Sequence, residues 1–467
     1  DSHNAVNNIL AAKGYTVENT NGRMTENGNT DLVWKWTNDT LDTTTFSTGA
    51  NGTAITNLFD ESDPNKSSDA PGSVTWMSRS DWTGTIPTAP AQLTANEHLA
   101  ASLAFTQYDG SEANSVEMPT LGAKNGLTLA SMIGKDFNDP EWDTLLDQLT
   151  YSEMVNTITL GFHNTAAAAS IGKTATKDEN GPQGLTAALT GGASAMCYTS
   201  EDVMAATFNT DLINEVGRCI GEDCLAMGYS GLYGPGINMH RTAYSGRNFE
   251  YYSEDGVLSG AMAANAIAGA QEHGVYAYMK HFALNDQEGN RNCMVATWSN
   301  EQAIREIYLK PFEMSVKDAD CHAVMSSFNY IGNRWAGGCK ELLNDVLRGE
   351  WGFVGFVETD YFGVYGYMTA DQAVRNGGDL MLCTTGNDYN NVTVLTNSSK
   401  QAMRTSAKNI LYTVVNSRAY DEENLNPGMA KWKIVLIGAD VVAALLIVGL
   451  EYTAIKNYKK RKEEEEV

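Results

Sequence analysis

The sequence offers little that would hold a fold together covalently or through a metal ion. Seven cysteines occur among the 467 residues, an odd number, and no two of them have C-x-x-C spacing. We therefore expect neither a disulfide framework nor a zinc site, and we interpret the cysteines as small core residues.

Basic residues are also scarce. The chain carries 32 Lys and Arg residues against 57 Asp and Glu residues, which gives a formal net charge of −25. Such a chain is poorly suited to neutralising phosphates, so we expect no nucleic-acid partner and favour a neutral substrate such as a sugar. A signal peptide is missing and the first residue is Asp1 rather than Met, so we expect a fragment of a longer protein.

Differences in composition and hydrophobic pattern divide the chain into four regions. Residues 1–92 are rich in Asn, Thr, Gly, Ser and Asp and are predicted to be mostly loops. Residues 93–425 alternate short apolar runs with helical stretches, and residues 431–455 are strongly apolar. The last region, residues 456–467, is highly charged.

The alternation in residues 93–425 predicts a parallel sheet with helical crossovers, which is an α/β fold. We expect a TIM-like (β/α)8 barrel, although the region is somewhat longer than the about 250 residues typical of that fold. A doubly wound open sheet is the competing fold, but no glycine-rich phosphate loop favours it. The expected strands are 231–233, 276–279, 323–326, 353–357 and 379–382, and expected helices include 300–319, 340–351 and 399–416.

The apolar region near the C-terminus predicts a membrane-type helix over residues 431–455. Its eleven Val, Ile and Leu residues between 434 and 450 favour insertion by about 3–7 kcal/mol, and Asp440 opposes it by about 3 kcal/mol. A buried or interfacial helix is the alternative. The tail that follows is predicted to be cytoplasmic and the barrel extracytoplasmic, because the tail contains Lys456, Lys459, Lys460, Arg461 and Lys462.

Polar clusters follow the predicted strands, and in a barrel the carboxyl ends of the strands meet at the mouth where catalysis occurs. Asp360 comes after strand 353–357 and is flanked by aromatic residues. Such a carboxylate can attack the anomeric carbon of a sugar, or it can cap the next helix. Lys280 and His281 directly follow strand 276–279 and offer two donors for sugar hydroxyls.

Two further clusters contain candidate binding residues. Arg247 could hold vicinal hydroxyls with its planar guanidinium, and Glu250 could orient it, although a solvated salt-bridge loop is the alternative. Asn180 precedes a Gly-Pro turn that could aim a polar side chain into the mouth. Taken alone, that segment is more simply interpreted as a plain loop.

Together these clusters resemble glycoside hydrolase family 3, and the resemblance runs from roughly Trp142 to Tyr420. The motifs occur in the family's order. They are a G-P-x-G turn after Asn180, G-R-N-F-E-Y-Y-S-E-D from Gly246, K-H-F-x-x-N from Lys280, V-M-S-S-x-N from Val324 and G-F-V-x-T-D from Gly355.

The resemblance implies a retaining β-glycosidase that hydrolyses β-linked glucosides or related sugars such as xylosides without a metal or cofactor. Asp360 would be the nucleophile that forms a covalent glycosyl-enzyme. Arg247, Lys280 and His281 would bind hydroxyls of the sugar at the cleaved bond.

Two positions depart from the family pattern. The family's turn Asp, which binds hydroxyls far from the anomeric carbon, is Asn180 here, and an amide loses the charge-assisted hydrogen bonds. Phe328, which we include among the expected substrate-binding residues, stands where the family often has a Tyr whose hydroxyl would lie near the nucleophile. The rival hypothesis is therefore a membrane-tethered sugar-binding protein that has lost hydrolytic activity.

The resemblance assigns no general acid within this chain. In the glucosidase-like branch of the family the acid comes from a second α/β domain, which usually follows the barrel. This chain is similar to a domain-reordered subgroup in which that domain comes first, so residues 1–92 would be its tail and linker. The N-acetylglucosaminidase branch, whose K-H-F-P-G-H-G loop carries a His acid, does not match residues 280–285.

Overall fold

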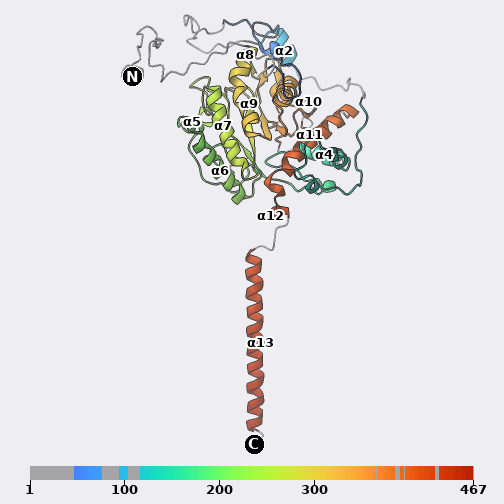
Figure 1. The fold of residues 1–467 in the computed structure, drawn as a ribbon, viewed down its shortest axis with the longest axis vertical. Helices are drawn as coiled ribbons and strands as arrows, with labels where there is room; N and C mark the ends of the chain where they lie inside the picture. The colour runs from blue at the N-terminus through green and yellow to red at the C-terminus, as the bar shows by residue number, and fades with distance from the viewer. Residues whose placement is uncertain are drawn as a thin grey trace, which may run out of the picture. The chain divides into compact units, whose positions relative to one another are not determined.

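The computed structural model describes residues 47–75, 94–103, 116–363, 365–383, 390–393, 395–425 and 431–465 (Figure 1). Most of the region 1–92, predicted to be the tail of another domain and a linker, lies outside these residues. Its described part, residues 47–75, contains turns and a short 3-10 helix, η2 (Asp60–Ser62).

Within the described residues, five parallel strands form one sheet in the order β1, β2, β3, β5, β8. Each strand pairs in parallel with its neighbour, so the predicted parallel-sheet α/β fold is confirmed. A smaller sheet of three strands has the order β4, β6, β7. The bounds are β1 (Asp178–Asn180), β2 (Gly231–Tyr233), β3 (Tyr276–Phe282), β4 (Ala296–Thr297), β5 (Ala323–Ser326), β6 (Tyr330–Ile331), β7 (Arg334–Trp335) and β8 (Phe356–Glu358).

Helices connect the strands of the main sheet. The predicted helix 300–319 is split into α8, η6 and α9, because Pro311 at the start of α9 lacks an amide hydrogen and widens the preceding turn to a π-helix. The bounds are α2 (Glu97–Leu103), α3 (Glu141–Leu146), α4 (Tyr151–Thr159), α5 (Glu201–Ala205), α6 (Thr210–Met227), α7 (Gly256–Gln271), α8 (Glu301–Ala303), η6 (Ile304–Tyr308), α9 (Lys310–Ala319), η8 (Glu341–Glu350), α10 (Ala370–Asn376), α11 (Asn397–Val415) and α12 (Glu422–Leu425).

Side chains that alternate along the strands divide between two apolar cores. Tyr276, Tyr278 and Phe356 pack in one core, whereas Ala277 and Val357 pack in the other. Strands of a parallel sheet that is covered on both faces are expected to be apolar on both faces, as β3 and β5 largely are. Strand β1, whose sequence is Asp-Glu-Asn, is the exception. The same alternation determines on which face of the sheet each residue at a strand end lies.

Backbone hydrogen bonds continue the pairing beyond β8 and β1. The predicted strand 379–382 pairs with β8 through one bridge, Glu358 to Leu380, rather than a full ladder. Three further bonds join this segment to residues 158–163 and then to β1. They are Met381 N to Ile158 O at 2.8 Å, Gly161 N to Met381 O at 3.1 Å, and Asp178 N to His163 O at 3.0 Å.

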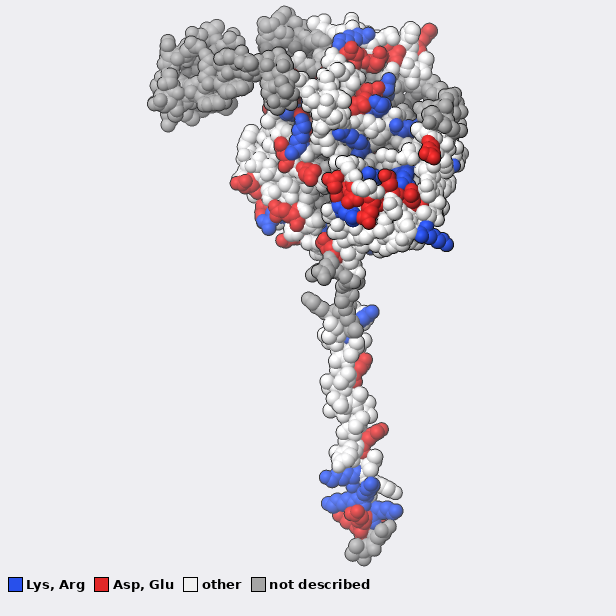
Figure 2. Space-filling view, turned by 45° about the vertical axis from the view of Figure 1, so that its right-hand side comes forward, with Lys and Arg blue, Asp and Glu red and all other residues white. Residues whose placement is uncertain are grey.

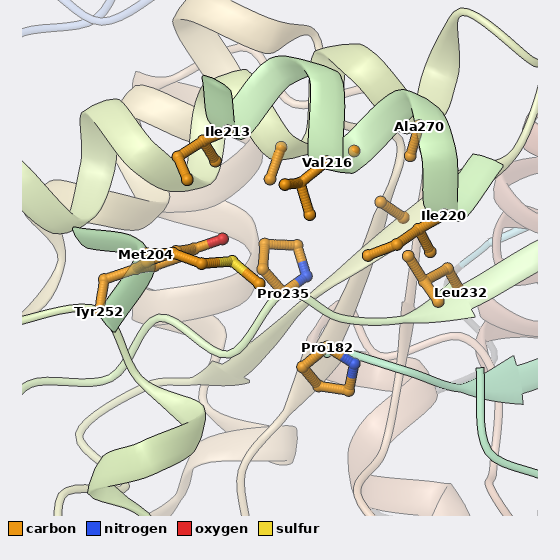
Figure 3. A pocket seen from close by; sticks show the side chains of 12 residues that line it. Pro182, Met204, Ile213, Val216, Ile220, Leu232, Pro235, Tyr252 and Ala270 are labelled. Atoms are coloured by element: carbon orange, nitrogen blue, oxygen red, sulfur yellow. The ribbon is translucent and has the colours of Figure 1, made fainter. Parts of the chain in front are cut away.

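Helices α6 and α7 lie side by side (Figure 1) and approach closely at glycine residues. A Cβ atom on Gly217 of α6 would lie 2.2 Å from the carbonyl oxygen of Ala266 in α7. Beside this contact is a small apolar cavity of about 20 Å³, with side chains such as Ile213, Ile220 and Pro235 around it (Figure 3). The helix pair therefore depends on glycine for its spacing.

Replacement of Gly217 by Ala is expected to destabilise the fold by about 1–3 kcal/mol, because the added methyl group meets backbone that cannot rotate away. Urea denaturation with matched m-values would measure the change. Glu222→Ala, at an exposed position of the same helix, is the control and should change the free energy of unfolding by less than about 0.5 kcal/mol. Equal urea concentrations at the unfolding midpoints of the two variants would contradict the prediction.

The predicted C-terminal helix is present as α13 (Lys431–Glu465). Among the described helices, α13 is the one long and apolar enough to cross a membrane, with mean hydropathy 2.4 over its apolar window and no part of that window buried. Figure 2 shows it as mostly uncharged until a cluster of basic side chains. The helix passes beyond the predicted end at residue 455 because Lys, Arg and Glu are good helix formers.

Candidate functional site

A pocket of about 500 Å³ is lined by residues at the carboxyl ends of the strands. Side chains at these ends converge in parallel α/β folds, which is why residues far apart in the sequence meet there. The lining brings together five of the residues predicted from the sequence, namely Asn180, Arg247, Lys280, His281 and Asp360.

Asp360 is held through both carboxylate oxygens. Its Oδ2 accepts a hydrogen bond from Arg291 Nη1 at 2.9 Å and lies 3.7 Å from His281 Nε2. Its Oδ1 accepts from the backbone N–H of Tyr361 at 2.7 Å. The helix that follows is capped by Thr369 instead, so the alternative role of Asp360 as a helix cap is wrong. Among the described lining residues, Asp360 is the only carboxylate.

Lys280 and His281 are both buried, and both line the pocket although they are adjacent in β3. Successive side chains of a regular strand point to opposite faces. Here the register of β3 against β5 shifts between Lys280 and Phe282. At this irregularity both side chains line the same pocket. The strand also extends through Phe282, beyond the predicted end at residue 279.

The imidazole of His281 is surrounded by donors. Arg247 Nη2 lies 3.2 Å from Nε2, and the Tyr251 hydroxyl lies 3.4 Å from Nδ1. Burial, followed by the positive charges of Arg247 and Lys280, lowers the pKa of His281 well below its ordinary value. The ring is therefore neutral and can accept a hydrogen bond as well as donate one.

Glu250 joins Arg247 to Lys280. Arg247 Nε donates to Glu250 Oε2 at 2.8 Å, as the sequence predicted, and Lys280 Nζ lies 2.9 Å from Oε1. The short 3-10 helix η5 (Asn248–Glu250) provides the turn that brings Arg247 and Glu250 together. Burial alone would raise the pKa of Glu250, but Lys280 and Arg247 outweigh it and keep that pKa below its usual value.

Arg291, which lies in the loop after β3, is a site residue that was not predicted from the sequence. Besides its bond to Asp360, its guanidinium lies 4.6 Å over the ring of Phe328. Phe328 is buried and is not among the pocket-lining residues, so it reaches the site through Arg291. A lone arginine in a loop shows no periodic pattern, and its contact with Asp360 spans 69 residues, so no local signal identifies it.

Three carboxyl groups lie buried on the described strands of the main sheet, namely Asp178, Glu179 and Glu358. Glu358 is fully buried, and its Oε2 has no hydrogen-bond partner in the described chain. Burial, followed by the charge of Asp178, raises the pKa of Glu358 well above its ordinary value. Asp178 accepts from the hydroxyls of Tyr276 at 2.6 Å and Tyr278 at 2.7 Å, and burial raises its pKa to about 6.

Comparison with known proteins identifies similar sequences. The model of the glycosyl hydrolase family 3 N terminal domain matches residues 163–410. The chain is 38% identical over 237 residues to the probable beta-glucosidase I of Neosartorya fischeri, covering 50% of this chain and 28% of that protein. It is also 38% identical over 241 residues to a beta-glucosidase of Rhizobium radiobacter, covering 51% of this chain and 29% of that protein.

Solved structures of similar proteins have the same fold. Beta-glucosidase 3B from Thermotoga neapolitana in complex with alpha-D-glucose has a TM-score of 0.54 at 30% identity, covering 61% of this chain and 44% of that chain. A beta-glucosidase from Paenibacillus barengoltzii has a TM-score of 0.57 at 27% identity, covering 68% of this chain and 37% of that chain. The chain thus spans less than half the length of each of these relatives.

The family model covers more than half of the chain and includes every strand of the main sheet and the pocket residues from His163 to Leu382. The resemblance found in the sequence motifs is therefore confirmed: the chain belongs to glycoside hydrolase family 3.

Proposed function

We propose that this chain works as a retaining β-glycosidase on β-linked glucosides or related sugars, with Asp360 as the nucleophile. The observation that carries the proposal is the position of Asp360 as the only carboxylate in the described pocket lining, with both oxygens fixed. The beta-glucosidase names of the relatives support a β-glucoside as the substrate class.

In this proposal Asp360 attacks the anomeric carbon, the bond to the leaving oxygen breaks, and a covalent glycosyl-enzyme forms. Arg247, Lys280 and the neutral His281 bind hydroxyls of the sugar at the cleaved bond, and Asn180 binds hydroxyls farther from the anomeric carbon. A second carboxylic acid about 5–5.5 Å from the nucleophile protonates the leaving oxygen and then activates water. We assign that acid to no residue of this chain and propose that another domain supplies it.

We propose that residues 93–425 form a closed TIM-like barrel and that residues 1–92 are the tail and linker of the acid-bearing domain. The hydrogen bonds that run from β8 through residues 380–382 and 158–163 to β1 support closure, because they leave both edges of the sheet paired.

We also propose that α13 anchors the protein in a membrane with the barrel outside the cytoplasm. Its exposed apolar surface supports insertion, because such a surface is stable in lipid and unstable in water. The five basic residues within 456–462 support a cytoplasmic C-terminal end.

The competing proposal is a membrane-tethered sugar-binding protein that no longer cleaves its ligand. Asn180 and Phe328, which replace the Asp and Tyr of the family pattern, favour it, as does the single carboxylate in the described lining. Binding without cleavage needs the hydroxyl-binding residues but no second acid.

Azide trapping with 2,4-dinitrophenyl β-glucoside tests the proposal. The dinitrophenolate leaves without protonation, so the covalent step needs no general acid, and azide then attacks the glycosyl-enzyme as an anion. We expect β-glucosyl azide in the NMR spectrum, because two inversions at the anomeric carbon give retention. The α-glucosyl azide would contradict a retaining mechanism. Glucose binding without any azide product would favour the binding protein.

A further inference from the structure

Glu288, in the loop after β3, lies between the two arginines of the site. Its Oε2 is 2.9 Å from Arg291 Nε, and its Oε1 is 3.6 Å from Arg247 Nη1. Oε1 is buried and makes no hydrogen bond among the described residues, although the positive charge of Arg247 lies close to it. Glu288 itself is not part of the pocket lining.

The contacts of Glu288 complete a cycle that returns to the proposed nucleophile. The cycle runs from Asp360 to Arg291 at 2.9 Å, to Glu288 at 2.9 Å, to Arg247 at 3.6 Å, to His281 at 3.2 Å and back to Asp360 at 3.7 Å. Negative and positive groups alternate around it, with the neutral His281 closing it. The guanidinium of Arg291 is therefore shared between Asp360 and Glu288, and that of Arg247 between Glu288, His281 and Glu250.

We propose that Glu288 is a positioning residue for the glycosidase reaction, which divides the guanidinium of Arg291 between two carboxylates and so keeps Asp360 available for attack. This inference rests on the proposed function. Arg291 uses Nε for Glu288 and Nη1 for Asp360. Without the charge of Glu288, Arg291 turns its whole planar donor edge toward Asp360 and forms a bidentate pair. A carboxylate bound in that way is a poorer nucleophile.

Arg247 responds less to the loss of Glu288, because Glu250 still holds it through Nε at 2.8 Å and Nη2 at 2.8 Å. Its contact with His281 is kept as well. Sugar binding by Arg247, Lys280 and His281 therefore changes little, whereas the covalent step slows. Loss of Glu288 should therefore slow the covalent step without weakening sugar binding.

Glu288→Gln tests this inference, with 2,4-dinitrophenyl 2-deoxy-2-fluoro-β-glucoside as the probe of the complete chain. Its binding constant Ki and the rate constant of covalent inactivation kinact are measured separately. We expect kinact to fall by about 10-fold or more, as for other residues that orient a reacting group indirectly, with Ki nearly unchanged. The fold should survive, because Glu288 and Arg291 are both partly exposed and such an ion pair contributes about 1 kcal/mol.

Glu272→Gln is the matched control, because Glu272 is also 2.9 Å from an arginine Nε, that of Arg218, but on the protein surface. It should leave kinact and Ki unchanged. A wild-type kinact in Glu288→Gln would overturn the inference, and so would parallel losses in kinact, Ki and melting temperature, which indicate a structural role alone. A wild-type chain that is never labelled would instead overturn the proposed function itself.

Discussion

Replacement of Asp360 by Asn is expected to abolish covalent labelling by a 2-fluoroglucoside and to lower cleavage of dinitrophenyl β-glucoside on the order of 10⁴-fold, a loss typical of removing a nucleophile. An amide cannot attack the anomeric carbon as a carboxylate does. The change is nearly isosteric, and the backbone N–H of Asp360 still donates to Ser326 O at 3.0 Å, so the fold should persist. Intact-protein mass spectrometry followed by peptide mapping measures the label.

The control for this experiment is Asp345→Asn, because Asp345 forms an ion pair with Lys340 at 2.8 Å outside the pocket. It should be labelled like the unmodified chain. A label on Glu358 or Glu250 would refute the assignment of Asp360. If no residue is labelled but sugar binding is retained, the competing proposal of a sugar-binding protein without hydrolytic activity is favoured.

A chain ending at Leu425 is expected to move from the membrane fraction to the supernatant. Insertion of the apolar run in α13 is favoured by about 3–7 kcal/mol against a cost of about 3 kcal/mol for Asp440. Ultracentrifugation of expressing cells, with and without detergent, measures the distribution. Residues 1–425, which include the pocket, are unchanged in the shorter chain, so labelling of Asp360 should persist.

A second variant separates insertion from loss of the helix. Leu445→Arg combined with Leu446→Arg keeps the length of α13 but adds about 2.5–3.5 kcal/mol for each arginine near the centre of the apolar run. This chain should also leave the membrane fraction. If the unmodified chain is already soluble without detergent, the proposed anchor is wrong.

The strands were predictable where an apolar run was bounded by polar residues. Strands 231–233 and 323–326 have the predicted bounds, because each is a short buried run. β3 extends three residues further than predicted, because Lys280 and His281 are polar but buried, and burial of a paired charge depends on Glu250, which is distant in the sequence. Local hydrophobicity carries no information about such a partner.

Part of the pocket was also predictable, because several of its residues lie at or just after the ends of predicted strands. Lys280 and His281 lie at the end of β3 and Asp360 follows β8, and the topology of a parallel sheet brings those positions together. Arg247 lies farther along, in the loop after β2, and its motif rather than its position in a strand identified it. Arg291 and Glu288 lie in a loop, where contacts depend on the path of the backbone rather than on a repeating pattern. Phe328, predicted to bind the substrate, lies under the guanidinium of Arg291 and is not among the described pocket-lining residues, and its role at the sugar stays a prediction.

The buried Glu358 links folding to the uptake of a proton. In the unfolded chain this carboxyl group ionises near its ordinary pKa of 4.5, whereas in the folded chain burial raises that pKa well above this value. Above pH 4.5 the folded state therefore holds a proton that the unfolded state has released. Unfolding then releases a proton. The contribution of Glu358 to the free energy of unfolding therefore falls as the pH rises from 4.5 toward the pKa of the folded state. Asp178, with its pKa raised to about 6, acts in the same direction, so each of these two carboxyl groups contributes more to stability in acid than in alkali.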